Sequence, residues 1–176
     1  MRTPITGSVI KLRPATMADR KQIYQWLAES DLTSLMLGPP LFPDNPVPVW
    51  YEFVSDYSHH FFDGSMPGKG QCYVIEVNGE PAGQVNHNEI YGNSTELDIW
   101  MRSSEYTGKG YGSDALETLC DHLRLTMGIH LFYIAPAAKN KAAIAAYKKA
   151  GFAPTPDKPD WLVPDYKKTT VMVKRL

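Results

Sequence analysis

Hydrophobic residues recur at helical spacing in two segments of the N-terminal half of the chain. The first segment follows Thr16, which fits a helix N-cap because Asp19 stands three residues later. The second runs from about Val49 to Phe62. Prolines and a glycine interrupt residues 38–48, so we expect an irregular loop between two helices.

Extended patterns surround and follow these helices. A short strand over 9–13 precedes the first helix, and residues 71–77 and 81–90 form two longer strands. Asn78-Gly79 joins the longer pair and is a strong signal for a two-residue hairpin turn. Residues 95–102 follow as the next strand, and side chains alternate between its two faces. Leu97, Ile99 and Met101 share one face; Glu96, Asp98, Trp100 and Arg102 share the other.

The C-terminal half returns to helical spacing and then alternates between strands and helices. We expect a helix over 110–127, a strand over 131–135, an alanine-rich helix over 140–150 closed by Gly151, a proline-rich loop over 154–164 and a strand over 169–173. Hairpin-linked strands followed by alternating elements predict an α/β (α+β) fold. Its sheet is expected to be antiparallel at first and partly parallel later.

Composition places the chain among ordinary globular proteins, with 43% hydrophobic and 21% charged residues. Its 176 residues suit one domain, 1–176. No segment approaches the roughly 20 apolar residues that span a bilayer, and residues 1–12 lack the apolar run of a signal peptide. The two cysteines, Cys72 and Cys120, show no metal-ligand spacing. We therefore expect a cytoplasmic protein without a membrane partner.

Charge is distributed unevenly along the chain, although the net charge is only −1. Residues 29–105 hold twelve acidic and two basic residues, a net charge of −10, whereas residues 106–176 have a net charge of +5. The two parts either meet partners of opposite charge or lie on surfaces where the charges cancel, and the sequence leaves both open. No basic stripe with interleaved aromatic residues predicts a nucleic-acid partner.

A glycine-rich segment, Tyr106-Thr-Gly-Lys-Gly-Tyr-Gly-Ser113, lies between a predicted strand and a predicted helix. Free N–H groups at a helix start form an anion site, and a pyrophosphate is its natural ligand. A Walker loop is excluded because Gly110 rather than Ser or Thr follows Lys109. The dinucleotide fingerprint fails as well, since Ser113 occupies the place of its last glycine.

A second signature follows downstream: Asn140-x-x-Ala143-x-x-x-Tyr147-x-x-x-Gly151-Phe152. Together with the glycine-rich segment it resembles the GNAT superfamily of N-acetyltransferases, over about residues 9–174. The resemblance implies a GNAT fold: a central mixed sheet, antiparallel in its N-terminal half, with a parallel pair splayed around acetyl-CoA and helices on both faces. It also implies acetyl-CoA as the cosubstrate and direct attack of a primary amine on the thioester.

The resemblance carries cofactor roles onto particular positions. It implies that the CoA pyrophosphate is held by Gly108, Lys109, Gly110, Tyr111, Gly112 and Ser113. It implies that the pantetheine arm is held by the strand backbone of Trp100, Met101 and Arg102 and by Asn140. Tyr147 would protonate the departing thiolate. Thr107 stands where the family has Gln or Arg, and Lys109 is expected to compensate for the lost long side chain.

Within the superfamily the chain most resembles aminoglycoside 6′-N-acetyltransferases. The resemblance rests on Tyr24-x-Trp26-Leu27, on Asn78-Gly79-Glu80-Pro81-x-Gly83, on Asp98 ten residues before Gly108, and on Pro136-x-x-x-Asn140. It makes Asp98 the residue that binds or deprotonates the acceptor amine. We expect Glu96, Trp100 and Glu89 to help bind the acceptor, a cationic small molecule such as an aminoglycoside or polyamine.

Two other functions stay open at this point: acetylation of a protein N-terminus or lysine, and a non-catalytic acyl-CoA-binding module. A homodimer is also left open. We expect no metal, because the adjacent residues His59 and His60 would point in different directions on a helix.

Overall fold

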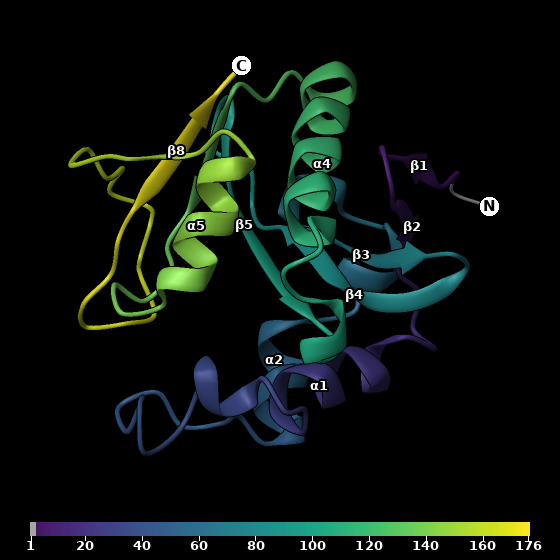
Figure 1. The fold of residues 1–176 in the computed structure, drawn as a ribbon. Helices are drawn as coiled ribbons and strands as arrows, with labels where there is room; N and C mark the ends of the chain where they lie inside the picture. The colour runs from purple at the N-terminus through teal and green to yellow at the C-terminus, as the bar shows by residue number, and fades with distance from the viewer. Residues whose placement is uncertain (1–2) are drawn as a thin grey trace.

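Eight strands form one sheet in the order β1-β2-β3-β4-β5-β6-β8-β7 in the computed structural model, which describes residues 3–176 (Figure 1). The first two residues of the expected domain 1–176 lie outside this range. The strands are β1 (Ile5–Thr6), β2 (Lys11–Pro14), β3 (Gln71–Val77), β4 (Glu80–His87), β5 (Ser94–Met101), β6 (Leu131–Ile134), β7 (Ala153–Pro154) and β8 (Met172–Arg175). Only β5 and β6 are parallel among these neighbours, which confirms the predicted mixed sheet.

Helices cover both faces of the sheet, as predicted. They are α1 (Arg20–Ala28), α2 (Trp50–Asp56), α3 (His60–Asp63), α4 (Tyr111–Met127) and α5 (Lys141–Lys149), with short 3₁₀ turns at Thr33–Leu35, Pro67–Lys69 and Ser104–Tyr106. Figure 1 shows α4 and α5 in front of the sheet and α1 and α2 beneath it. Within residues 3–176, no helix is long and apolar enough to cross a bilayer.

Two hydrophobic cores lie on opposite faces, and strand β5 contributes to both. Leu97 is fully buried in the core beneath α4, beside Leu116 and Phe132. Trp100 is buried in the other core, where α1 and α2 supply Ile23 and Phe53. The predicted alternation of β5 therefore holds, and it directs Glu96 and Asp98 to the same face as Trp100.

The predicted helix over 49–62 is interrupted, contrary to expectation. Helix α2 ends at Asp56, and α3 begins only at His60. The buried guanidinium of Arg20 accounts for the break, because it donates to the carbonyl oxygens of Val54 at 2.7 Å and Tyr57 at 2.9 Å. These oxygens at the end of α2 are thereby satisfied from a different helix, and the chain is free to turn.

Several element boundaries also differ from the prediction. Helix α1 begins at Arg20 with Asp19 at its N-cap position, although the Thr16 amide does donate to the Asp19 carboxylate at 2.7 Å, and Asp19 also pairs with Arg13. The last strand lies at 172–175 rather than 169–173, since its pairing partner β6 ends opposite Met172. The short strands β1 and β7 were not predicted, and two-residue strands carry no periodic signal.

Candidate active site

Strands β5 and β6 separate partway along the sheet. Their parallel pairing ends at Glu96 and Tyr133, although β5 continues to Met101. Beyond this point β5 still bonds to β4, since the Arg102 amide donates to the Ala82 carbonyl at 2.8 Å. Successive backbone groups of a strand point to opposite edges, so the amides of Ile99 and Met101 face the gap.

This alternation changes the expected roles of the 100–102 backbone. Met101 presents its backbone to the gap, whereas the amides of Trp100 and Arg102 point to β4. Ile99, for which no cofactor role was expected, presents its backbone to the gap with Met101. The Arg102 side chain turns away as well, donating to the Pro81 carbonyl at 3.2 Å and lying over the Tyr106 ring.

The glycine-rich segment forms an exposed loop that leads into the N-terminus of α4. Gly108 and Gly110 have φ values of 70° and 83°, a left-handed conformation that side chains other than glycine rarely adopt. The Asp114 amide is bonded back to the Gly110 carbonyl at 3.0 Å. The preceding helical amides, those of residues 111–113, have no acceptor within the helix and point outward with the positive end of the helix dipole.

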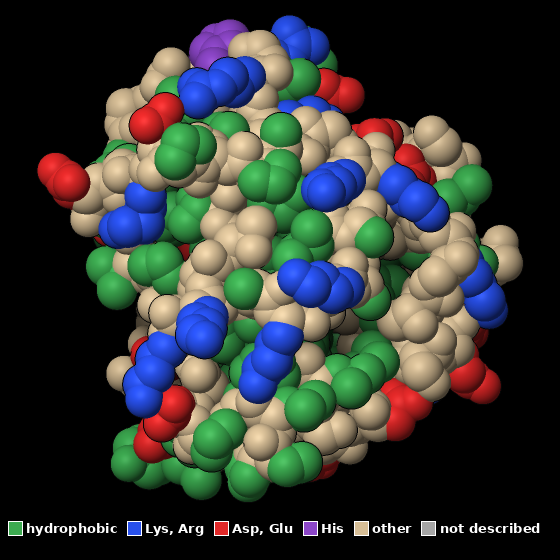
Figure 2. Space-filling model, turned by 60° about the vertical axis from the view of Figure 1, so that its left-hand side comes forward, with side chains coloured by type: hydrophobic (Ala, Val, Ile, Leu, Met, Phe, Trp, Pro, Cys, Tyr) green, Lys and Arg blue, Asp and Glu red, His purple; other side chains and the backbone are tan. Residues whose placement is uncertain are grey.

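Two side chains of this loop are engaged within the protein. The Thr107 hydroxyl donates to the Ser104 carbonyl at 2.8 Å, and the Ser113 hydroxyl donates to the Ala146 carbonyl of α5 at 2.9 Å. The Thr107 amide also donates to the Ser104 carbonyl, at 3.1 Å, so of the two residues only Ser113 offers a ligand its backbone N–H. Lys109 is exposed at the tip of the loop. Figure 2 shows further Lys and Arg side chains spread over the face that α5 and β8 occupy.

Helix α5 brings the second signature to the gap between β5 and β6. Asn140 caps the helix, its side-chain oxygen accepting from the Ala143 amide at 3.2 Å. Tyr147 lies two turns further on, and both residues line the same cleft. Burial and the charge of Asp98 raise the pKa of Tyr147 well above its usual range, so the phenol keeps its proton at neutral pH.

This cleft, which we call the acidic cleft, has a volume of about 380 Å³. It is lined by Leu27 of α1, by the end of α2, by Glu96 and 98–100 of β5, by 134–137 at and after the end of β6, by α5 and its cap Asn140, and by the loops at 36–48 and 165–166. Five carboxyl groups line it: Asp44, Asp56, Glu96, Asp98 and Asp165. Among the described residues that line it, none is Lys, Arg or His. The cleft therefore concentrates cations.

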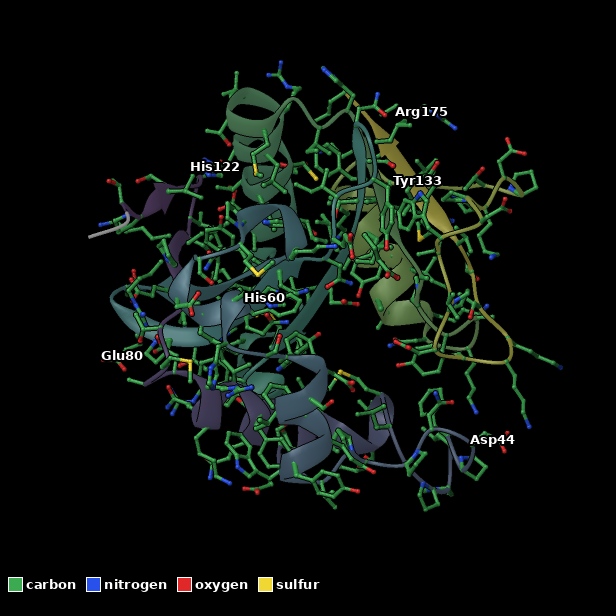
Figure 3. All side chains as sticks on the ribbon, turned by 180° about the vertical axis from the view of Figure 1, so that it is seen from behind. Asp44, His60, Glu80, His122, Tyr133 and Arg175 are labelled. Carbon is green, nitrogen blue, oxygen red and sulfur yellow. The ribbon has the colours of Figure 1, made fainter. Side chains whose placement is uncertain are left out.

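Two proline-rich loops meet over one end of the acidic cleft. Asn45 donates from its side chain to the Asp165 carbonyl, and Tyr166 donates to the Met36 carbonyl at 3.0 Å. Lys167 pairs with Asp44 at 2.9 Å. Figure 3 shows Asp44 on its loop beneath the C-terminal segment. These bonds fix the two loops relative to each other.

Glu96 and Asp98 form a carboxyl pair at the inner wall of the cleft. The Asn88 side-chain amide donates to Asp98 at 2.9 Å and to Glu96 at 3.4 Å. Burial raises the pKa of both carboxyls, and the charge of Asp98 raises the pKa of Glu96 further. Donation from Asn88 opposes the rise at Asp98. A carboxylate with a raised pKa is a stronger base than a solvated one.

The structure does not bring every expected acceptor residue to the cleft. Glu89 lies outside it and pairs with Lys69, because β4 ends at His87 and the chain turns away. Trp100 lines the cleft, but its indole N–H is already bonded to the Ile23 carbonyl at 3.2 Å. Its contribution to a ligand is therefore an apolar surface.

Four polar residues of the site were missed by sequence reasoning: Asn86, Asn88, Asp56 and Asp165. The first two carried a signal, because polar side chains at 84, 86 and 88 alternate along β4 on the face that Asp98 shares. Asp56 and Asp165 carried none. The fold alone brings a helix end and a C-terminal loop to the same cleft.

A family model described as an acetyltransferase (GNAT) domain matches residues 10–153. The aminoglycoside acetyltransferase AAC(6')-Ib, in complex with ribostamycin and coenzyme A, is similar in structure with a TM-score of 0.73 and 20% identity, covering 96% of this chain and 94% of that chain. RimL, a ribosomal alpha-N-protein acetyltransferase in complex with coenzyme A, has a TM-score of 0.72 at 19% identity, covering 99% and 98%. Spermidine N-acetyltransferase from Vibrio cholerae, in complex with CoA and spermine, has a TM-score of 0.69 at 20% identity, covering 96% of each chain. At these identities the structural likeness shows a shared fold. A comparison with curated protein sequences found no significant match.

Proposed function

The chain belongs to the GNAT family of acetyltransferases, and from this premise we propose that it acetylates a primary amine of a small molecule that carries several amines. The observation that carries the proposal is the acidic cleft, where five carboxyl groups and no basic side chain of residues 3–176 line the space beside the β5–β6 gap. Such a cleft binds a molecule with several positive charges more tightly than one with a single charge.

Acetyl-CoA supplies a thioester whose carbonyl carbon accepts the amine. The residues present suit it, because a pyrophosphate fits the outward-facing amides of 111–113 beside the left-handed glycines Gly108 and Gly110. The backbone of Ile99 and Met101 and the Asn140 side chain would hold the pantetheine arm. Lys109 would add a positive charge near the phosphates, in place of the family residue that Thr107 replaces.

Asp98 accepts the proton that the acceptor amine must lose before or during attack. The new N–C bond then forms as the C–S bond breaks, and Tyr147 gives its proton to the departing sulfur. Outward-facing amides on β5 stabilise the developing oxyanion. Both residues line the acidic cleft, Asp98 from β5 and Tyr147 from α5.

Two solved structures with this fold support a polycationic acceptor, since one is bound to ribostamycin and another to spermine. RimL, an alpha-N-protein acetyltransferase, has the same fold, so a protein α-amine is the alternative acceptor. The bonds between the 36–48 and 165–167 loops favour the small molecule, because they restrict one end of the cleft. We place the enzyme in the cytoplasm, which the buried, unpaired Cys72 and Cys120 support.

Free-thiol release from acetyl-CoA, measured over a panel of amines, tests this function. The panel contains aminoglycosides, spermidine, simple diamines, a monoamine of similar size, and peptides with free N-termini. We expect turnover with molecules that carry two or more amines and little with the monoamine. Turnover confined to the peptides would reassign the cleft to a protein substrate. Binding of acetyl-CoA without turnover of any amine would favour a non-catalytic module.

A further inference from the structure

Three side-chain amides form a directed chain along β4 that ends at the carboxyl pair. Gln84 donates to the Asn86 oxygen at 3.1 Å, and Asn86 donates to the Asn88 oxygen at 2.8 Å. Asn88 in turn donates to Asp98 at 2.9 Å and to Glu96 at 3.4 Å. Gln84 and Asn86 are fully buried, so the chain runs inside the protein beside the cleft.

The direction of this chain is fixed from its carboxyl end. An ionised carboxylate only accepts hydrogen bonds, so Asn88 must turn its NH₂ group toward Asp98 and its oxygen toward Asn86. Asn86 must then present its own NH₂ group to Asn88, and Gln84 its NH₂ group to Asn86. A reversed chain would place an amide oxygen against the carboxylate. Asn88 therefore has one favourable orientation only while Asp98 is ionised.

The far end of the chain is consistent with this direction. The Gln84 oxygen is buried and has no hydrogen-bond partner within the part of the chain that the structure describes. Leaving a buried acceptor unpaired is unfavourable. The arrangement keeps every NH₂ group pointing toward the carboxyls and leaves the one unpaired oxygen at the end away from them. Hydrogen bonds in such a chain polarise one another in the same sense.

We propose that Asn88 is a positioning residue that holds Asp98 in its ionised, proton-accepting form, and that Asn86 and Gln84 fix the orientation of its amide. The catalytic consequence of this positioning rests on the proposed function, in which Asp98 accepts the proton of the acceptor amine. The ionisation of Asp98 itself is a property of the free protein and does not depend on the acceptor.

Burial and the charge of Asp165 raise the pKa of Asp98, the opposite of the effect of Asn88, and further titratable groups surround it. The carboxyls nearby are Glu96 on the same strand, Asp165 on the β7–β8 loop and Asp56 of α2. The phenols and thiol nearby are Tyr57, Tyr147, Tyr166 and Cys72. Within residues 3–176 no cation lines the cleft to balance them. Among these neighbours Asn88 and Asn86 favour the ionised form, and Asn88 touches Asp98 directly.

Carboxyl ¹³C NMR of the aspartate-labelled free protein tests the proposal without any acceptor. The Asp98 signal is identified by its loss in Asp98→Asn, and its titration midpoint is compared in wild type, Asn88→Leu and Asn88→Ala. We expect both variants to raise the midpoint by about one pH unit, because the donor to the ionised form is lost. Asn86→Leu should raise it by less. Asn93→Leu, on the exposed turn after β4, is the matched control and should leave it unchanged.

The same variants assayed with the best amine separate this proposal from the proposed function. A positioning role moves the acidic limb of the kcat/KM profile upward in pH with the NMR midpoint, so activity recovers as the pH rises. An unchanged Asp98 midpoint in both Asn88 variants, measured on protein that unfolds cooperatively, would overturn the proposal. A raised midpoint in a protein that acetylates no amine would support the positioning and refute only the proposed function.

Discussion

Glu96 and Tyr133 are the last residues paired between β5 and β6, and the two strands part immediately beyond them. Asp98 stands two residues further along β5, on the same face as Glu96, and so lies at the start of the opening. The gap between two strands of one sheet thus places a carboxyl pair, free backbone amides and the Tyr147 phenol around a single space. The roles proposed for Asp98 and Tyr147 depend on that separation.

Replacing Tyr147 by Phe removes the proton that we assign to the departing thiolate. The kcat of Tyr147→Phe should fall by about 10²-fold or more, the usual effect of losing a general acid. The affinity for acetyl-CoA should change little, because the ring remains. The rate of free-thiol release measures kcat, and calorimetric titration with CoA measures the affinity. Tyr133→Phe, which lies outside the acidic cleft, serves as the control, and equal losses in both variants would contradict the role.

Gly110 and Gly79 allow a direct test of the glycine loop. Both have a φ of 83°, and an added Cβ would meet nothing within 4 Å at either position. Alanine at each should cost about 1–2 kcal/mol of backbone strain and lower Tm similarly. Only Gly110→Ala should weaken CoA binding. If the loop relaxes in the free variant, it must return to the left-handed conformation when CoA binds, and that strain corresponds to a loss of about 5- to 30-fold in affinity. A similar Kd for both variants would remove the loop from the CoA site.

The acidic cleft should bind its acceptor partly through charge. Asp56→Asn should raise KM for a multi-amine acceptor about two- to fivefold, the size expected of an exposed ion pair. The effect should shrink as salt rises from 0.05 to about 0.5 M, because ions screen exposed charges. Asp160→Asn, an exposed change in the β7–β8 loop, should leave KM unaltered. A salt-independent KM in the wild type would argue against an electrostatic cleft.

The carboxyl pair should make stability depend on pH in a defined direction. The pKa of Glu96 is raised in the folded protein above its ordinary 4.5, so the folded state holds more protons than the unfolded state between these two pKa values. Stability from this group is therefore complete below the unfolded pKa and is lost as the pH rises toward the folded pKa.

Glu96→Gln should escape this loss. The Tm of Glu96→Gln relative to wild type should therefore rise between pH 5 and pH 8. A pKa difference of one between the folded and unfolded states corresponds to about 1.4 kcal/mol of stability. Each kcal/mol of stability changes Tm by about 2–4 °C. Differential scanning calorimetry at the two pH values measures it. A Tm difference that stays constant or falls with rising pH would show that Glu96 titrates normally in the folded protein.

Much of the fold could be predicted because the sheet's strands and long helices carry strong local patterns. The Asn78-Gly79 hairpin, the two faces of β5 and the cap at Gly151 follow from turn chemistry and side-chain periodicity. The break between α2 and α3 could not be predicted, because it depends on hydrogen bonds from Arg20, which is more than 30 residues away in the sequence. Local sequence contains no trace of a distant side chain that satisfies a helix end.

The residues expected to hold the cofactor have a clearer pattern in the sequence than those that line the acidic cleft. Most of these cofactor residues lie in two continuous segments, 106–113 and 140–152, whose spacing is visible in the chain, and the others are in the adjacent strand at 100–102. The acidic cleft is instead assembled from segments scattered along the whole chain, so Asp56 and Asp165 could not be found, and Glu89, which was expected to help bind the acceptor, lies outside it. Asn88 could have been found from the alternation of β4, had its polar face been matched to that of β5.

The most direct test of the account compares wild type with Asp98→Asn on the best multi-amine acceptor, at saturating acetyl-CoA. Asn keeps the shape of Asp98 but accepts no proton, so kcat/KM should fall by about 10²- to 10⁴-fold while CoA binding stays within about twofold. Part of this loss should be recovered at high pH, where the acceptor amine is already neutral. A kcat/KM within about threefold of wild type at neutral pH would contradict the account, because the amine would then lose its proton elsewhere.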